Sequence, residues 1–455
     1  MSADVGAVVL AAGLGTRMKS ARPKVLHELG GRPLLSWAVE TARQAIDGGR
    51  VAVVIGAETR SAAGELLGEQ TELVVQAERL GTGHAVLQAD KCLPDAGWIL
   101  VTSADMPLLR PESLRQVVDL QRRSNGVLTL LTAQTDTPRG FGRIVREASG
   151  SVTAIVEEAA AGPEQLRLRE VNLGAYCFRA EWLWPALPRL PLSSKGEYYL
   201  TDLVAMAVEE GKGVGIAITE DLEEAIGVNT REHLAEAEAA LRRRIQSRWM
   251  LAGVTLQDPT STYIGPEVTL GADTVVLANT HLEGKTSVGQ GCRLGPNTRI
   301  RDSVLGDDCV VEASVLEGAR LDEQVEVGPF AHLRPGAHLM RGVHLGNFGE
   351  VKDSTLGPGT KMGHFSYVGN AEIGAQVNIG AGTITCNFDG ETKHPTTIGD
   401  GAFIGSDTML VAPVKVGKGA RTGAGAVVTK DVPDDSVAVG IPARVIRKLK
   451  GSHAG

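Results

Sequence analysis

A six-residue repeat in the second half of the chain constrains the fold most. An aliphatic or small residue returns at every sixth position from Ile398 to Val428, and a glycine usually follows it. The same spacing separates Ile373 from Ile379. A period of six fits neither an α-helix nor the two-residue alternation of a flat strand. It is typical of a parallel β-helix, in which each repeat forms one short face with its aliphatic side chain pointing inward.

We therefore expect residues 252–455 to form a left-handed parallel β-helix of hexapeptide repeats. Aromatic residues make up only 4% of the chain, whereas glycines number 56. Such a solenoid buries a narrow aliphatic column and has little use for large rings. The composition agrees with the repeat.

Residues 1–230 follow a different pattern, in which short aliphatic runs alternate with helix-like segments. The runs occupy residues 7–13, 51–56, 72–76, 98–105 and 127–133. This alternation predicts an α/β, Rossmann-like domain with a mainly parallel sheet and helices on both faces. Ligands of such sheets bind at the carboxyl ends of the strands. The residues that follow each run are therefore the candidates for a site.

A connecting helix is expected over residues 231–251. Leu234, Ala237, Leu241 and Ile245 fall three or four positions apart with charged residues between them. The basic run at 242–244 could also belong to a DNA-binding surface, but basic residues are common on solvated helix faces. We favour the plain linker.

Charge and cysteine content exclude several classes of protein. The chain has 46 Lys and Arg against 54 Asp and Glu, and its net charge of −8 gives no general attraction to nucleic acid or anionic membranes. Its five cysteines form no CxxC pair, so neither a disulfide framework nor a zinc site is expected, and a reducing cytoplasm fits best. No apolar run reaches the roughly 20 residues that span a bilayer. No basic segment precedes the run at 5–12, which we interpret as a strand rather than a signal peptide.

A glycine-rich segment follows the first strand. Residues 10–18 read LAAGLGTRM, and residues 22–24 read RPK. The glycines allow the backbone to approach a phosphate chain, and Arg17 and Lys24 supply positive charge. The segment matches neither the dinucleotide GxGxxG pattern nor the P-loop.

The complete string resembles the sugar-1-phosphate nucleotidyltransferase signature. Together with QAERLGTGHA at 76–85, GRIV at 142–145 and GEYYLTD at 196–202, it is similar to the bacterial GlmU family over nearly the entire chain. That family joins an N-acetylglucosamine-1-phosphate uridylyltransferase to a glucosamine-1-phosphate acetyltransferase. The resemblance implies acetylation of glucosamine-1-phosphate with acetyl-CoA, then UMP transfer from UTP to give UDP-N-acetylglucosamine and pyrophosphate for peptidoglycan and lipopolysaccharide synthesis.

The resemblance also implies a front site. Gln76, Gly81 and Thr82 would recognise uracil, and Asp105 and Asn229 would bind Mg²⁺. Arg17 and Lys24 would act as catalytic cations, because an anionic sugar phosphate must attack the α-phosphorus of UTP. The expected nucleotide and sugar site comprises Leu10, Ala11, Gly13, Lys24, Gln76, Gly81, Thr82, Asp105, Gly142, Glu157, Asn172 and Asn229.

Two features qualify this front site. Asp105 precedes Met-Pro, so taken alone it could be a simple turn residue. The chain also departs from the family pattern, with Ala104 where a glycine is usual and residues 158–161 reading EAAA rather than Glu-Lys-Asp-Ala. The first departure would crowd the ribose slightly, and the second removes a Lys and an Asp near the sugar.

One region of the repeats breaks the aliphatic pattern. Arg334, Lys352, His364, Tyr367 and Asn378 lie about one coil apart, so their side chains would stack into a lateral pocket for a phosphorylated sugar. A charge on a solenoid is usually only solvated, and a lone histidine usually satisfies a turn. The resemblance implies that Arg334, Lys352, Tyr367 and Asn378 bind the sugar phosphate. It makes His364 the general base for the glucosamine amine.

The same resemblance implies an acetyl-CoA site. Its expected residues are Ala381, Asn387, Phe388, Ser406, Ala424 and Arg444. Ser406 would donate to the oxyanion. Phe388 stands where the family often has Tyr, and Ile441 stands where it has a coenzyme-contacting Arg, for which Arg444 is the expected substitute.

Family members are trimers, so a homotrimer is expected. Two alternatives remain open from the residues: a single-activity sugar nucleotide pyrophosphorylase with a regulatory β-helix, and a non-catalytic scaffold or regulatory subunit. The first would have no need of the cluster around His364. The second would be expected to lack Asp105 or Lys24, and both are present.

Overall fold

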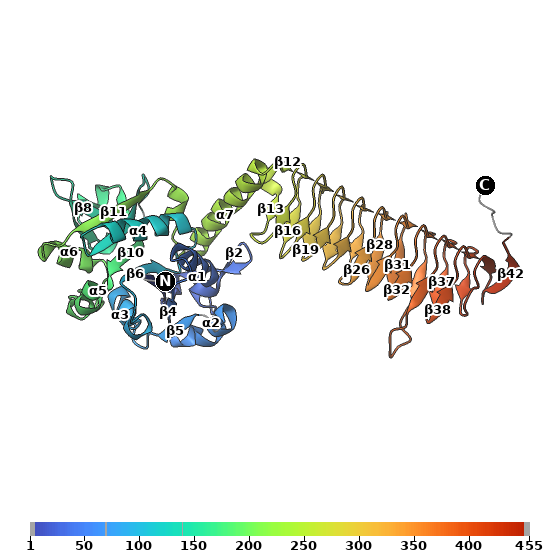
Figure 1. Ribbon diagram of the computed structural model, residues 1–455, viewed down its shortest axis with the longest axis horizontal. Helices are drawn as coiled ribbons and strands as arrows, with labels where there is room; N and C mark the ends of the chain where they lie inside the picture. The colour runs from blue at the N-terminus through green and yellow to red at the C-terminus, as the bar shows by residue number, and fades with distance from the viewer. Residues whose placement is uncertain (1–4, 69–70, 139, 450–455) are drawn as a thin grey trace. The chain divides into compact units, whose positions relative to one another are not determined.

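The computed structural model describes residues 5–68, 71–138 and 140–449 (Figure 1). The chain forms two compact units, Met1–Leu241 and Arg242–Gly455. The division falls inside the long helix α7 (Arg231–Leu251). Over the described ranges, none of the helices has the length and apolar character needed to span a bilayer.

The first unit is built on a central sheet with strand order β11-β7-β10-β6-β1-β4-β5. All five predicted strands are confirmed. They are β1 (Val5–Ala11), β4 (Val51–Ile55), β5 (Glu72–Val75), β6 (Trp98–Ser103) and β7 (Leu128–Gln134). At the far edge, β11 (Val214–Thr219) runs parallel to β7.

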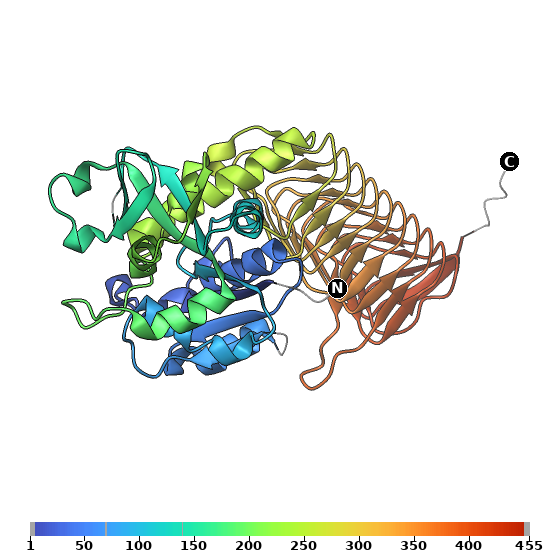
Figure 2. The ribbon, with the colours of Figure 1, turned by 60° about the vertical axis from the view of Figure 1, so that its left-hand side comes forward.

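Helices cover both faces of this sheet (Figure 2). They are α1 (Leu34–Ala45), α2 (Arg60–Leu67), α3 (Thr82–Leu87), α4 (Pro111–Arg123), α5 (Ala180–Ala186) and α6 (Asp202–Glu209). Alternate residues of β1 pack into two separate cores. Val9 belongs to the core under α1 and α4, whereas Val8 belongs to the core under α3, α5 and α6. The expected layering follows from this alternation.

The sheet is mixed rather than all parallel, because β10 (Glu170–Arg179) runs antiparallel to both β6 and β7. Its pairing with β7 slips between Asn172 and Tyr176, where Gly174 adopts a φ of 68°. A short hairpin of β8 (Arg143–Arg146) and β9 (Val152–Val156) joins the sheet beside this bulge. Bulges of this kind redirect side chains, and this one faces the candidate site described below.

The second unit is a three-sided parallel β-helix, as expected from the repeat. The first sheet has 12 strands from β12 (Thr255–Leu256) to β42 (Arg444–Lys448), of which only the final strand is antiparallel. The second sheet has 10 strands from β13 (Tyr263–Ile264) to β40 (Val427–Val428). The third has nine, from β14 (Thr269–Leu270) to β38 (Val414–Val416).

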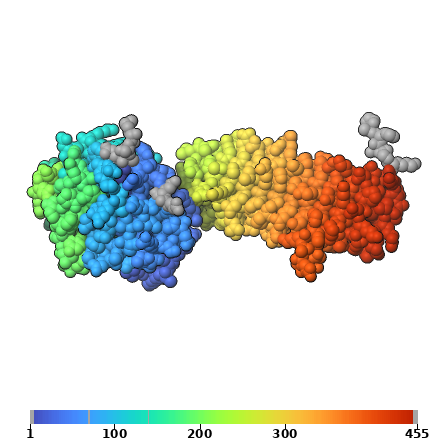
Figure 3. Space-filling model, turned by 60° about the horizontal axis from the view of Figure 1, so that its bottom comes forward, coloured from blue at the N-terminus to red at the C-terminus, as the bar shows by residue number. Residues whose placement is uncertain are grey.

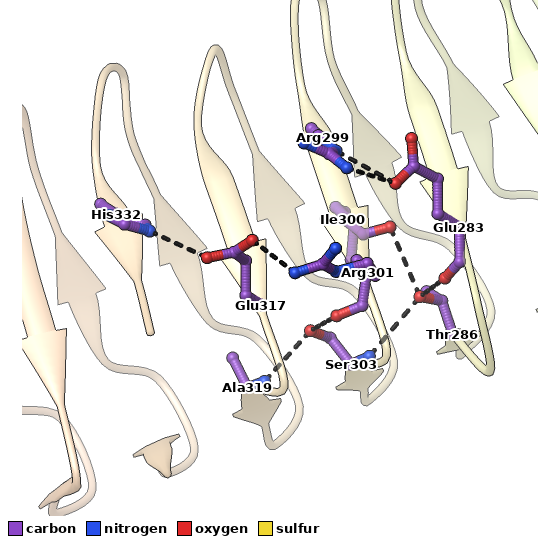
Figure 4. A network of polar contacts seen from close by, with 9 residues as sticks. All are labelled: Glu283, Thr286, Arg299, Ile300, Arg301, Ser303, Glu317, Ala319 and His332. Carbon is purple, nitrogen blue, oxygen red and sulfur yellow. Dashed lines mark hydrogen bonds and ion pairs between the residues drawn. The ribbon is translucent and has the colours of Figure 1, made fainter. Parts of the chain in front are cut away.

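Buried hydroxyls satisfy the backbone where coils turn (Figure 4). Ser303 Oγ donates to the Arg301 carbonyl at 2.8 Å and accepts from the Ala319 amide at 3.1 Å. Outside, Arg301 also pairs with Glu317 at 2.9 Å. Half-exposed ion pairs contribute little, whereas a buried N–H without an acceptor is costly. The hydroxyls therefore matter more to the solenoid than the visible ion pairs.

One loop interrupts the coils. Residues 387–395 leave the solenoid between β34 (Ile384–Cys386) and β35 (Thr396–Ile398) and protrude from its side (Figures 1 and 3). Asp389 organises the loop, because its Oδ1 accepts from the amides of Glu391 and Thr392, each at 2.8 Å, and its Oδ2 lies 2.6 Å from His394 Nε2.

Candidate active sites

The glycine-rich loop after β1 places Lys24 beside the strand ends. Gly15 has a φ of 63°, and a Cβ built on it would lie 3.4 Å from Lys24 Cα and closer still to Lys24 Cβ. Only glycine fits there without displacing the lysine. The Ala104 amide donates to the Leu10 carbonyl at 2.9 Å and so ties the end of β6 to the end of β1. Both segments therefore reach the carboxyl edge of the sheet together.

The two expected magnesium ligands converge on one ammonium group. Lys24 Nζ donates to Asp105 Oδ2 at 2.8 Å and to Asn229 Oδ1 at 3.1 Å. Ser103 Oγ donates to Asp105 Oδ1 at 2.6 Å, and the Val228 amide donates to the Asp105 carbonyl at 2.7 Å. Burial raises the pKa of Asp105, but the charge and hydrogen bond of Lys24 outweigh it and hold that pKa below its usual value. The carboxylate is therefore ionised at neutral pH.

A cavity of about 330 Å³ opens at this edge of the sheet. The expected residues that line it are Leu10, Arg17, Thr82, Asp105, Gly142, Glu157, Asn172 and Asn229. Sequence reasoning missed others, namely Phe141, Tyr176, Thr201 and His233. A larger and more open hollow of about 1020 Å³ lies over α2 and β5, but none of the expected residues lines it.

The lining of the cavity includes a carboxyl and an amide, those of Glu157 and Asn172. Glu157 Oε1 accepts from Thr201 Oγ1 at 3.1 Å, and Asn172 Nδ2 donates to Tyr176 Oη at 2.6 Å. The Gly174 amide donates to Asn172 Oδ1 at 3.1 Å, so the bulge of β10 orients this side chain. Burial raises the pKa of Glu157, and the hydrogen bond from Thr201 only partly opposes it. These groups can exchange hydrogen bonds with a polar, hydroxylated ligand.

The expected uracil-binding residues lie next to one another, but of the three only Thr82 lines the cavity. Gln76 is buried and donates through Nε2 to the Gly81 carbonyl at 3.1 Å. Gly81 has a φ of 103°, and a Cβ there would lie 2.5 Å from the Tyr198 carbonyl. The Leu200 amide donates to Thr82 Oγ1 at 2.9 Å. The structure thus joins two motifs more than 100 residues apart, QAERLGTGHA and GEYYLTD.

The family departures lie close to this cavity. Ala104 is fully buried behind the lining residues. Glu158 Oε2 accepts from the Gly140 amide at 2.7 Å and from Arg143 Nη2 at 3.0 Å. The first residue of the EAAA segment therefore fixes the loop that carries Gly142.

In the second unit, Arg334, Lys352 and Tyr367 lie on adjacent coils of the second sheet. Lys352 ends β28 (Gly349–Lys352) and stands opposite Gly369 of the next strand, β31 (Ser366–Gly369). Arg334 Nη1 donates to Glu350 Oε1 at 2.9 Å. A Cβ on Gly369 would lie 2.7 Å from Tyr367 Cζ, so the missing side chain leaves room for the phenol ring.

His364, Ala381, Ser406 and Ala424 form one column along the corner between the first and second sheets. Each is the second residue after a strand of the first sheet. Those paired strands are β30 (Lys361–Met362), β33 (Asn378–Ile379), β36 (Phe403–Ile404) and β39 (Arg421–Thr422). Asn378 itself lies on the first sheet, around this corner from Tyr367. The single chain thus aligns the histidine with three expected coenzyme-binding residues.

The protruding loop adds a cation that sequence reasoning missed. The hydrogen bond and charge of Lys393, followed by the charge of Arg334, lower the pKa of Lys352. Lys393 bridges to Phe388 across the loop, and Asn387 Nδ2 anchors the start of the loop through Asn370 Oδ1 at 2.6 Å. Three cations therefore approach each other on this face, an arrangement suited to a phosphate.

Comparison with known proteins agrees with both units. The MobA-like NTP transferase domain model matches residues 7–204, and the bacterial transferase hexapeptide model matches 395–430. A hexapeptide repeat of succinyl-transferase matches 285–316. Bifunctional protein GlmU of Heliobacterium modesticaldum is 46% identical over 95% of this chain and 94% of its own length. The GlmU of Trichlorobacter lovleyi is 47% identical over 95% of each chain.

The chain belongs to the GlmU family. Membership confirms the expected bifunctional enzyme, a uridylyltransferase and acetyltransferase that makes UDP-N-acetylglucosamine. It excludes both alternative functions, a pyrophosphorylase with a regulatory solenoid and a non-catalytic scaffold. UTP and acetyl-CoA are accordingly substrates of a GlmU protein, whereas the residues that bind them here remain predictions.

Arg444 is the expected GlmU residue with the least structural support. It pairs with Val439 in the antiparallel step from β41 (Ser436–Val439) to β42. Gly440 is the second residue after Ala438, which pairs with Thr422, so Gly440 continues the corner column beyond Ala424. Arg444 therefore lies near the end of that column, on an exposed strand.

Proposed function

We propose that Asp105 and Asn229 bind the magnesium ion of uridylyl transfer in the front cavity. The observation that carries this proposal is their convergence on Lys24 Nζ, a cation already placed between a carboxylate and an amide oxygen. Mg²⁺ prefers oxygen ligands and retains several waters or phosphate oxygens, so two protein ligands suffice. When bound, the ion offsets charge as pyrophosphate leaves.

The chain's own residues orient the reactants. Arg17 and Lys24 face the triphosphate, and Gln76 with its neighbours holds the base. Glu157 and Asn172, which line the cavity, bind the sugar so that its phosphate oxygen attacks the α-phosphorus in line. No protein nucleophile is required, because the substrate supplies the attacking oxygen.

We propose His364 as the general base of acetyl transfer. Arg334, Lys352 and Lys393 hold the phosphate of glucosamine-1-phosphate, with Tyr367 and Asn378 contacting the sugar. His364 takes a proton from the amine, whose nitrogen then attacks the thioester carbonyl of acetyl-CoA. The Ser406 hydroxyl donates to the oxyanion, and the carbon–sulfur bond breaks to release the coenzyme thiolate.

The enzyme is further proposed to be a cytoplasmic homotrimer. All five cysteines are unpaired, which favours a reducing compartment. Tyr367 and Asn378 lie on different faces of the solenoid, on either side of a corner. A ligand that contacts both residues is therefore covered by this chain on one side only. A neighbouring copy at this corner would supply the second wall. Sedimentation of the purified chain tests the assembly.

Two substitutions test the assignment. His364→Ala should abolish thiol release from acetyl-CoA and glucosamine-1-phosphate while leaving pyrophosphate release from UTP and N-acetylglucosamine-1-phosphate intact. Asp105→Ala should have the converse effect. His344→Ala and Asp119→Ala serve as matched controls and should leave both activities unchanged. A folded His364 or Asp105 variant that loses both activities would contradict the two-site model.

A further inference from the structure

Lys24 is hydrogen-bonded to both proposed magnesium ligands, a contact that the proposed chemistry does not require. The ammonium of Lys24 stands between Asp105 and Asn229 and donates to both. Lys24 is only 8% exposed, so water competes little for its hydrogen bonds. The oxygens that a divalent cation needs are therefore already engaged by a cation of the protein.

Arg17 reinforces this arrangement. Its Nη2 donates to Asn229 Oδ1 at 3.0 Å, the same oxygen that accepts from Lys24. One amide oxygen offers two lone pairs, and both are taken. An incoming cation that used Asn229 would have to displace both donors.

Charge points in the same direction. The three charged side chains that meet around Asn229, namely Arg17, Lys24 and Asp105, together carry a net charge of +1, so this cluster does not attract a free divalent cation. Glu157, the other carboxyl of the lining, is hydrogen-bonded to Thr201 instead. A nucleotide triphosphate reverses the sign of that net charge. It also supplies phosphate oxygens to which both basic side chains can transfer their hydrogen bonds.

The geometry of the loop limits how Lys24 can respond. Its Cα and Cβ pack against Gly15, so its backbone cannot move toward the glycine-rich loop, whereas the flexible end of the side chain can. The nearby basic side chain of the cavity lining is Arg17, on the glycine-rich loop where a phosphate chain would lie. A swing of the ammonium toward bound phosphate would therefore release Asp105 and Asn229 together.

We infer that Lys24 is an internal stand-in for the metal, which closes the magnesium site until nucleotide phosphates draw the ammonium away. This inference rests on the proposed function, because it takes Asp105 and Asn229 as the metal ligands. Its consequence is coupled loading: the divalent cation binds weakly to the free enzyme and enters with the nucleotide. A metal held without nucleotide would instead require an open pair of ligands.

The test measures Mn²⁺ binding to the full-length chain without nucleotide, by electron paramagnetic resonance of free Mn²⁺. Lys24→Met keeps the stem but removes the charge, and it should tighten Mn²⁺ binding on the order of tenfold. Arg17→Met, at an exposed position, should tighten it by a smaller factor and covers the case in which Lys24→Met does not fold. Lys19→Met removes a charge from the same segment without a bond to Asp105, and it should match the parent.

The outcomes separate this inference from the proposal beneath it. Adding Asp105→Asn to Lys24→Met should return Mn²⁺ binding to the weak level, which places the gain at this carboxylate. If Lys24→Met, Arg17→Met and the parent bind Mn²⁺ with equal affinity, Lys24 does not stand in for the metal and the inference is wrong. If instead Asp105→Asn leaves the Mn²⁺ dependence of pyrophosphate release unaltered, the proposed metal site itself is wrong.

Discussion

Gly369 keeps the Tyr367 phenol in place, and its replacement by alanine should impair acetyl transfer alone. A Cβ at this position would lie 2.7 Å from Tyr367 Cζ and 2.9 Å from Asn387 Nδ2, whereas ordinary contacts begin near 3.4 Å. The phenol must therefore move by at least about 0.7 Å. The backbone of Gly369 is outside the left-handed region, so alanine adds no φ strain.

A misplacement of about 1 Å at a reacting centre costs on the order of a hundredfold in rate. We therefore expect kcat/KM for glucosamine-1-phosphate to fall by roughly tenfold to a hundredfold in Gly369→Ala, as measured by thiol release. Pyrophosphate release and the melting temperature should stay at the parent level.

Gly363→Ala is the matched control, because a Cβ there meets no atom within 4 Å although the residue adjoins His364. It should retain acetyl transfer. If Gly369→Ala acetylates as fast as this control, the position of the Tyr367 phenol does not matter to the sugar site. An equal loss of both activities would mean that the change acts on folding.

Three further predictions concern single groups. Burial raises the pKa of Glu157, so the stability that comes from its protonation is present below the pKa of the unfolded state and is lost as the pH rises through the pKa of the folded state. Glu157→Gln should therefore raise the melting temperature at pH 7 more than at pH 4. The same substitution should raise KM for N-acetylglucosamine-1-phosphate. Ser303→Ala leaves a buried N–H of the next coil without its acceptor and should lower the melting temperature by roughly 2 to 10 °C, whereas Ser287→Ala, which loses only an exposed hydroxyl pair, should change it little. Lys393→Ala should raise KM for glucosamine-1-phosphate several-fold, and this KM should depend less on salt than that of the parent. The check is KM measured at two ionic strengths, and the control Lys415→Ala should match the parent.

Sequence patterns predicted β1, β4, β5, β6 and β7 of the front sheet but only part of the wall of its cavity. The predicted strands are continuous aliphatic runs, whose local composition suffices to identify them. The antiparallel strand β10 is interrupted at Asn172–Gly174, and neither its direction nor its partners follow from local composition. Tyr176 enters the cavity because of that pairing, and no motif marks it. Conversely, Asp105 was predictable as a lining residue because it ends an aliphatic run, whereas Asn229 was expected from the family resemblance alone.

In the solenoid, the repeat fixes the scaffold, and the departures from it supply the charged and polar side chains of the proposed acetyltransferase site. A count by six relates Ser406 to Ala424, which lie 424 − 406 = 18 residues apart, but it does not reach His364, because the intervening coils are 381 − 364 = 17 and 406 − 381 = 25 residues long. The pairing of the strands is what places His364 in the same corner column. The position of Lys393 does not follow from the repeat, because this residue lies in a loop that interrupts the six-residue period. Its contact with Lys352 depends on the conformation of that loop, which the hydrogen bonds of Asp389 determine. A repeat of identical coils would present the same surface everywhere. A phosphate pocket at one level therefore requires a local insertion, which is where the third cation is found.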